Sequence, residues 1–174
     1  MKECLIIVDY QNDFVDGKLG FKGAEKLEPL IIGKIKKAIK NHTDFYFTKD
    51  THHDDYLLTE EGHHLTTPHC LEGTPGHELY GGLKAFESLA KGIFHKPTFA
   101  SLELGLALRQ QNYDKVELCG LVTHICVISN AVMAKAALPG AKIVIDQNLV
   151  ASFDPILHQK SLEVMQGFQI DIEG

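Results

Sequence analysis

The chain has 174 residues, of which 44% are hydrophobic and 23% charged, and its formal net charge is -6 at neutral pH. This length and hydrophobic content suit one globular domain with a substantial core, so we expect a single domain over residues 1–174. The negative charge and the absence of any Lys/Arg-rich run argue against nucleic acid or an anionic membrane as the main partner. The composition instead favours a small-molecule substrate or a protein partner.

No apolar run approaches the ~20 residues that span a bilayer, and the apolar stretch near the N-terminus is too short for a secretory signal. We therefore expect a soluble, cytoplasmic protein whose four cysteines stay as thiols. Cys4 and Cys119 lie in apolar runs and are expected in the core. Cys70, beside His69, is either a candidate metal ligand or a thiol without a chemical role.

In the first part of the chain, apolar runs alternate with a helical pattern, which indicates βαβ units that build a parallel sheet. CLIIVD (Cys4–Asp9) is a continuous apolar run ending on a carboxylate, as expected of a strand buried on both faces. The apolar spacing over Gly23–Asn41 predicts an amphipathic helix. DFYFTKD (Asp44–Asp50) predicts the second strand.

The alternation continues in the second half of the chain. Strands are predicted over Gly92–Lys96, Lys115–Gly120 and Ala141–Asp146, and helices over about Ser101–Gln111 and His124–Leu138, before a last helix and strand. Six strands with right-handed crossover helices predict a three-layer α/β/α doubly wound fold with a mainly parallel sheet.

Residues 51–92 form a long insertion without a clear period, and irregular insertions of this length in a compact domain are usually functional. The stretch KDTHHDDYLLTEEGHHLTTPHC, residues 49–70, contains five histidines and five acidic residues. This composition raises the question of a metal site, and a polar loop that binds nothing is the alternative.

Three reactive side chains fall near the carboxyl ends of predicted strands, where open α/β sheets bind ligands. Asp9 closes the first strand, Lys96 closes GIFHK, and Cys126 lies at the start of the helix after KVELCG. A helix N-terminus and a nearby lysine both favour thiolate over thiol. With a carboxylate to take the thiol proton, the three suit covalent acyl transfer. The alternative is a buried cysteine, a capping aspartate and a solvated lysine.

Geometry also reduces the number of candidate metal ligands in the histidine-rich loop. A mononuclear site needs three or four convergent side chains, and Asp50 and His52 project from one extended edge, whereas His53 points the opposite way. His69, constrained by Pro68, is a candidate third ligand. Oxygen and nitrogen ligands without a thiolate suit Zn, Fe or Mn.

Five motifs, in order, resemble the cysteine hydrolases of the isochorismatase-like superfamily and, within it, the nicotinamidases. They are IIVDYQNDFVDG, TKDTH, PHCLEGTPGHEL, KPTFAS and GLVTHICV, and they cover nearly the whole chain. The resemblance implies that Cys126 is the nucleophile, Asp9 the general base and acid, and Lys96 the group that stabilises the thiolate. It also implies a cis peptide between Leu121 and Val122, and an oxyanion hole built from the backbone N–H groups of Val122 and Cys126.

The resemblance further implies one divalent metal ion, foremost zinc with iron or manganese as alternatives, that holds the pyridine nitrogen of the substrate. Its implied ligands are Asp50, His52, His69 and, as a fourth, Glu61. Phe14 and Leu121 are expected to contact the substrate. His63, His64 and His77 are expected to be loop or surface residues.

The expected enzyme is a cysteine-dependent amidohydrolase, a nicotinamidase that converts nicotinamide, and also pyrazinamide, to the acid and ammonia through a cysteinyl thioester in NAD salvage. We expect a homo-oligomer. Two positions depart from many nicotinamidases: Thr66 replaces an aromatic residue and His124 replaces Asp. The alternatives are an isochorismatase-like hydrolase acting on another small amide, carbamoyl or ureido acid, a non-catalytic ligand-binding domain, and a metal buffer.

Overall fold

The computed structural model describes all 174 residues and contains one six-stranded sheet in the order β3-β2-β1-β4-β5-β6. The strands are β1 (Glu3–Val8), β2 (Asp44–Asp50), β3 (Gly92–Lys96), β4 (Lys115–Leu121), β5 (Lys142–Ala151) and β6 (Asp171–Glu173). The helices are α1 (Asn12–Val15), α2 (Glu28–Lys40), α3 (Glu60–His64), α4 (Leu102–Gln111), α5 (Ile128–Ala137) and α6 (Pro155–Gly167). Every strand pair is parallel, which confirms the predicted doubly wound fold.

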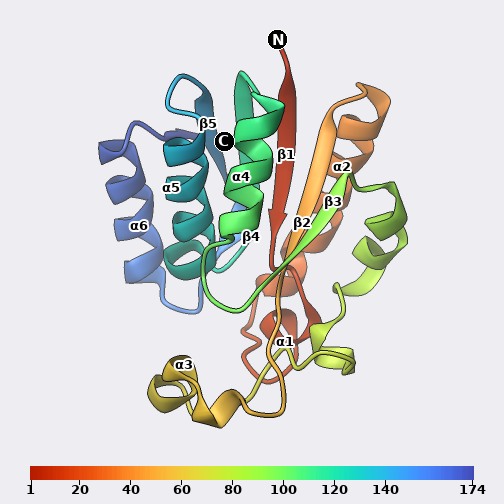
Figure 1. The fold of residues 1–174 in the computed structure, drawn as a ribbon, viewed down its shortest axis with the longest axis vertical. Coiled ribbons are helices and arrows are strands. Elements are labelled where there is room, and N and C mark those ends of the chain that lie inside the picture. Colours follow the sequence, from red (N-terminus) through yellow and green to blue (C-terminus); the bar gives the residue numbers. More distant parts are fainter.

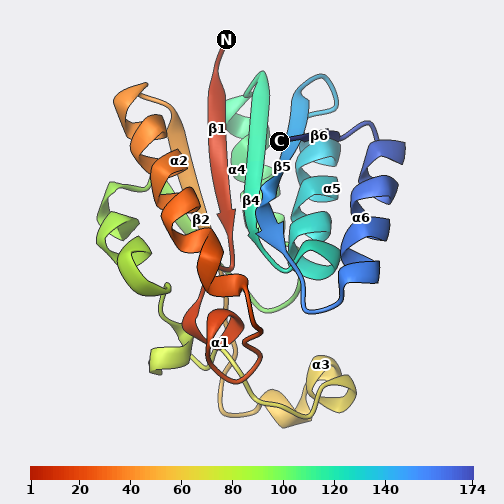
Figure 2. The same cartoon turned by 180° about the vertical axis from the view of Figure 1, so that it is seen from behind.

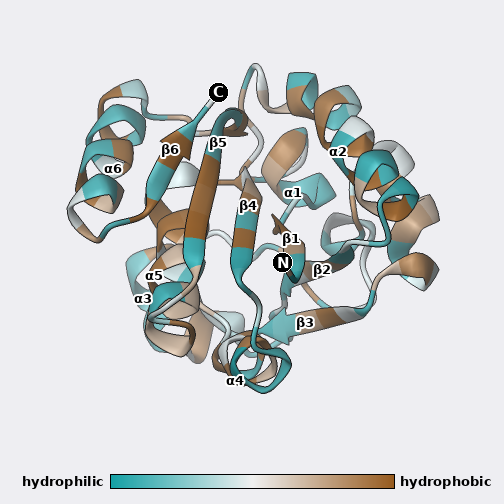
Figure 3. Cartoon of the chain, turned by 90° about the horizontal axis from the view of Figure 1, so that it is seen from above, coloured by the Kyte–Doolittle hydropathy of each residue, from teal (hydrophilic) through white to brown (hydrophobic).

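Helices cover both faces of the sheet, with α4, α5 and α6 on one face and α2 on the other (Figures 1 and 2). Alternate residues of β1 enter the two cores: Ile6 packs with the α4–α6 side, and Leu5 and Ile7 pack with α2. Burial on both faces explains the continuous apolar run of β1. Figure 3 shows a hydrophobic stretch along β5, alternating hydrophilic and hydrophobic bands along β4, and mixed colours on α2 and α6.

Two predicted helices begin differently in the structure. The segment predicted as one helix over Gly23–Asn41 is a 3-10 turn, Ala24–Leu27, followed by α2, because Pro29 has no N–H to extend a helix backwards and favours a helical first turn. The helix predicted from His124 begins as a π-helical turn, Thr123–Val127, and α5 follows from Ile128.

Two segments are longer or more ordered than predicted. β5 continues past Asp146 to Ala151, after a register irregularity opposite β4. Residues 51–92 are partly regular: they contain α3 and three 3-10 turns, Tyr56–Leu58, Pro75–His77 and Gly81–Leu89, whereas residues 65–70 lie in neither a helix nor a strand. In Figure 1, α3 lies below the carboxyl ends of the strands. None of the helices combines the length and apolar character needed to span a bilayer.

Close approach of β4 to β1 depends on Gly120. Its φ is +116°, and a Cβ atom there would lie 2.1 Å from the carbonyl oxygen of Val8. Only glycine meets both demands without displacing the backbone.

Gly120→Ala should therefore lower the free energy of unfolding by about 2–4 kcal/mol. Gly33→Ala is the matched control, because Gly33 lies in the exposed face of α2 with nothing within 4 Å of a new Cβ; it should stabilise by about 0.5–1 kcal/mol. Urea denaturation measures both. Equal midpoints for Gly120→Ala and wild type would contradict this account.

Candidate active site

The sheet order places three predicted residues at one edge. β1 is central, with β2 and then β3 on one side and β4 on the other, so the residues that end or follow these strands meet below the sheet (Figure 2). Asp9 follows β1, Lys96 ends β3 directly opposite Asp50 of β2, and Cys126 lies in the π-helical turn after β4. This is the edge at which doubly wound sheets bind ligands.

A buried lysine connects these side chains. The Nζ atom of Lys96 lies 2.6 Å from Oδ2 of Asp9, 3.1 Å from Oδ1 of Asp50 and 3.6 Å from Sγ of Cys126, and it donates a hydrogen bond to the carbonyl oxygen of Thr98 at 3.0 Å. Lys96 and Asp9 are both 0% exposed. The Cys126 thiol and the Asp9 carboxylate are thus both within reach of the same buried ammonium. The structure thus brings together a thiol, a carboxylate and an ammonium.

Burial decides the charge state of the thiol. It raises the pKa of Cys126 well above its ordinary value, more than the Lys96 ammonium lowers it. The raised pKa favours the thiol over the thiolate that the sequence pattern favours, because the loss of solvation outweighs the nearby cation. Burial also raises the pKa of Asp9, against the pull of Lys96. For Lys96, burial opposes the charge, but Asp9, Cys126 and Asp50 outweigh it and raise the pKa.

The four predicted metal ligands converge beside this cluster. One ligand atom from each lies within 4.8 Å of the others, and the residues are Asp50, His52, Glu61 and His69. Oδ2 of Asp50 lies 3.0 Å from Nε2 of His52 and 3.2 Å from Nε2 of His69. Oε2 of Glu61 is buried without a hydrogen-bond partner. Two imidazoles and two carboxylates, one of which has an unpartnered buried oxygen, fit a divalent cation.

Other histidines of the loop stand apart from this group. His53, His63 and His64 are exposed, as expected of residues that bind no metal. The expectation of a surface position for His77 is wrong: it is 4% exposed, its Nε2 lies 2.9 Å from Oγ1 of Thr51, and its ring stacks on His95 at 5.4 Å. His77 is a structural anchor of the loop.

The remaining cysteines are packed as core residues. Cys4 and Cys119 belong to the two hydrophobic cores, and Cys70 is fully buried outside the group of metal ligands. Burial raises the pKa of all three thiols. Cys70 is therefore a core thiol, and Cys126 is the one cysteine that lines the cavity beside the metal ligands.

A cavity of about 140 Å³ lies between the thiol and the metal group. Its lining is Phe14, Leu19, Asp50, Glu61, Leu65, His69, Phe99, Val122, Ile125, Cys126 and Phe153. Phe14 is placed as expected, with its ring 5.6 Å from that of His69. Leu121 is not: its side chain is fully buried in the α2-side core, because alternation along β4 turns it away from the cavity. The Leu121–Val122 peptide is cis, as the resemblance implied.

Several polar residues that hold the site were missed from the sequence. The side chain of Gln11 accepts from the N–H of Asp50 at 2.7 Å and donates to the carbonyl oxygens of Asp50 and His77, both at 2.9 Å. Asp13 accepts from the N–H of Cys70 at 2.8 Å. The sequence indicated their importance, because both residues follow the buried first strand inside the motif IIVDYQNDFVDG.

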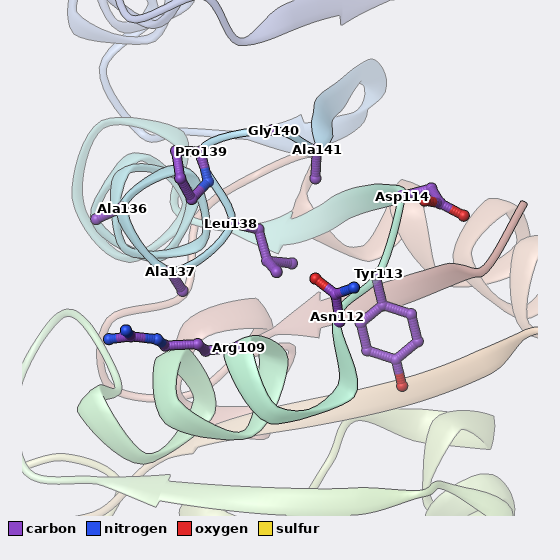
Figure 4. A pocket seen from close by; sticks show the side chains of 10 residues that line it. All are labelled: Arg109, Asn112, Tyr113, Asp114, Ala136, Ala137, Leu138, Pro139, Gly140 and Ala141. Atoms are coloured by element: carbon purple, nitrogen blue, oxygen red, sulfur yellow. The ribbon is translucent and has the colours of Figure 1, made fainter.

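A wider hollow of about 680 Å³ lies at the opposite end of the sheet. Figure 4 shows its lining, which comes from the ends of α4 and α5 and the turns that precede β4 and β5. Its ionisable side chains are Arg109, Tyr113 and Asp114, and it contains no thiol or group of carboxylates. The smaller cavity at Cys126 is therefore the candidate active site.

Comparison with known proteins agrees with this geometry. The model of the isochorismatase domain matches residues 3–173, and the chain belongs to this family. It is 34% identical over 177 residues to the isochorismatase family protein PncA of Bacillus subtilis, with 93% of each chain covered. It is 28% identical over 184 residues to the nicotinamidase/pyrazinamidase of Mycobacterium tuberculosis, covering 97% of this chain and 96% of that one.

Solved structures show the same fold. The crystal structure of nicotinamidase PncA from Bacillus subtilis has a TM-score of 0.88 and 33% identity, with 100% of both chains covered. The pyrazinamidase of Pyrococcus horikoshii, in complex with zinc, has a TM-score of 0.87 and 26% identity, with 99% and 98% covered. The chain is therefore a member of a hydrolase family whose relatives act on amides.

Loss of a ligand should remove the metal. His69→Ala should weaken zinc binding at least about 100-fold, because two carboxylates and one imidazole leave the coordination incomplete. His63→Ala, in the same loop but exposed, is the control and should bind like wild type. Isothermal titration of the chelator-treated proteins measures both. Equal zinc affinity in the two variants would exclude His69 as a ligand.

The anchor His77 should make stability depend on pH. Burial lowers its pKa to about 4, below that of an unfolded histidine near 6.5. The unfolded chain therefore binds the proton of His77 more tightly than the folded chain does. The contribution of neutral His77 to the free energy of unfolding is present above about pH 6.5 and is lost as the pH falls toward 4.

His77→Gln should reduce the acid decline in the free energy of unfolding between about pH 7 and 4 by on the order of 1–3 kcal/mol. Urea denaturation at several pH values measures it, with the exposed His53→Gln as control. A decline of the same size in His77→Gln and wild type would show that His77 does not carry it.

Proposed function

We propose that this protein is a nicotinamidase, which hydrolyses nicotinamide, and also pyrazinamide, to the acid and ammonia. One observation carries the proposal: a single small cavity is lined at once by the thiol of Cys126 and by three of the four candidate metal ligands, with Phe14 beside them. A thiol with a carboxylate and an ammonium suits attack on an amide carbon. An apolar cavity of this size suits one aromatic ring.

The relatives support the same substrate class. Proteins named as nicotinamidases or pyrazinamidases match this chain along nearly its whole length. The group formed by Asp50, His52, Glu61 and His69 favours this function over a metal-independent hydrolase of the same fold. Such an enzyme would return nicotinamide to NAD synthesis.

The proposed reaction begins with proton transfer. The Asp9 carboxylate takes the proton of the Cys126 thiol, which is protonated at rest, while the Lys96 ammonium at 3.6 Å stabilises the sulfur anion that forms. Sγ then attacks the amide carbon. Backbone N–H groups of Val122 and Cys126 would stabilise the developing oxyanion, and such donors are commonly worth about 3 kcal/mol each.

Collapse of this intermediate breaks the C–N bond, and Asp9 returns its proton to the leaving ammonia. A thioester between Cys126 and the nicotinoyl group remains. Asp9 then takes a proton from water, which attacks the thioester carbon and releases nicotinate, and the thiol regains its proton. Asp9 acts in both halves, which is consistent with its burial beside both Lys96 and the thiol.

The metal would orient the substrate. A divalent ion, foremost zinc, held by the four ligands would supply a Lewis acid beside the ring nitrogen. Phe14 packs next to His69, so that its ring forms an apolar wall for the pyridine.

Cys126→Ala should reduce ammonia release from nicotinamide at least about 10³-fold, because no other thiol faces the cavity. Cys119→Ala is the control: it also removes a buried thiol, but Cys119 lies in the α2-side core, and the variant should keep its turnover number. The measurement is steady-state release of ammonia and nicotinate by zinc-loaded protein.

Two results would count against the proposal in different ways. Absence of product from zinc-loaded wild type would rule out the substrate. Product formed at the wild-type rate by Cys126→Ala would rule out the thioester route while leaving the substrate intact.

A further inference from the structure

The cavity has an aromatic side chain from a part of the chain that no motif covers. Phe153 lies in the turn between β5 and α6, at the same end of the molecule as α3 (Figure 2), and it lines the cavity together with Cys126. It is 58% exposed, so its ring stands at the mouth with one side toward solvent. Phe99, 44% exposed, and Leu65, 37% exposed, line the same cavity.

Two rings hold Phe153 in this position. Its centroid lies 6.2 Å from that of Phe21 at 74° and 5.0 Å from that of His124 at 76°, and both pairs have the edge-to-face geometry that aromatic rings favour. The Phe153 side chain is therefore fixed although more than half of it is exposed.

His124 is itself fixed by a hydrogen bond to the turn that carries Phe153. Its Nδ1 lies 2.7 Å from Oγ of Ser152, and this oxygen also accepts from the N–H of Asp154 at 3.0 Å. The tautomer of His124 sets which of the two groups donates this hydrogen bond. Burial lowers the pKa of His124, which favours the neutral imidazole. The turn that carries Phe153 is thereby tied to the π-helical turn that carries Cys126.

The cavity is lined by three phenylalanine rings from three separate segments. Phe14 comes from α1, Phe99 from the turn after β3, and Phe153 from the turn after β5. Thr66, where many nicotinamidases have an aromatic residue, does not line the cavity.

We propose that Phe153 is a specificity-determining residue, which contacts the ring of an aromatic amide at the mouth of the cavity, and that His124 is the positioning residue that holds Phe153 there. The inference rests on the proposed function and names the side chain that selects aromatic over aliphatic amides. Neither residue touches the reacting bond. Their loss should therefore weaken substrate binding and leave the chemical step intact.

The test is steady-state kinetics of zinc-loaded protein with nicotinamide. Phe153→Ala should raise KM about 3- to 10-fold, the range expected for one aromatic contact, with kcat within about twofold of wild type. Phe153→Leu keeps an apolar side chain, so its KM should lie between those of wild type and Phe153→Ala. Phe168→Ala is the matched control, because Phe168 is 48% exposed at the end of α6 and lies outside the cavity; its KM should equal that of wild type.

His124 is tested by a double-mutant cycle. His124→Ala should raise KM in the wild-type background and add less than about twofold in the Phe153→Ala background, because it acts through that ring. An equal effect of His124→Ala in both backgrounds would overturn its positioning role.

The proposed function and this inference fail in different ways. Wild type without turnover of nicotinamide overturns the proposed function and the inference with it. Wild-type turnover together with an unchanged KM in Phe153→Ala overturns the inference alone.

Discussion

The site depends on the burial of one ammonium group. Lys96 is 0% exposed, and an isolated charge in that position would cost several kcal/mol. Asp9 and Asp50 offset this cost from either side, at 2.6 and 3.1 Å. The same three residues end or follow three neighbouring strands, so the ion pairs also join the strand ends. The other oxygen of Asp50 faces His52 and His69. The lysine cluster, which is Lys96 with Asp9 and Cys126, and the group of metal ligands therefore share the Asp50 carboxylate.

β1 and β5 show how far a sequence determines such a fold. β1 is buried on both faces, and its unbroken apolar run made it recognisable. In β5, Gln147 and Asn148 are exposed polar residues beyond Asp146, so hydrophobicity ended the predicted strand too early, although pairing with β4 resumes at Val150. A pattern reports the burial of side chains, whereas a strand is defined by backbone pairing, and the two differ where one part of a strand is exposed.

The same distinction separates the predicted from the missed parts of the site. Asp9 and Lys96 were recognisable because the carboxyl ends of parallel strands share an edge. The protonated state of Cys126 was not, since the helix-dipole argument uses local sequence, while burial depends on every element packed around the thiol. Phe153 gave no signal, because a lone aromatic residue in a turn has no periodicity, and its contact with His124 joins segments distant in the chain.

The balance of charge explains why the metal group and the lysine cluster belong together. Asp9 and Asp50 flank the one buried ammonium, and Glu61 lies beside the two histidines of the metal ligands. When all three carboxylates are ionised and the histidines are neutral, two negative charges are left unmatched. The side chains respond in the expected direction: burial and Asp50 raise the pKa of Glu61, and at His69, where burial opposes the charge, Asp50 and Glu61 outweigh it and raise the pKa. A divalent cation would supply the missing two charges. Lys96 alone balances one carboxylate, so the group around Asp50 is suited to a cation of charge two rather than to a second buried lysine.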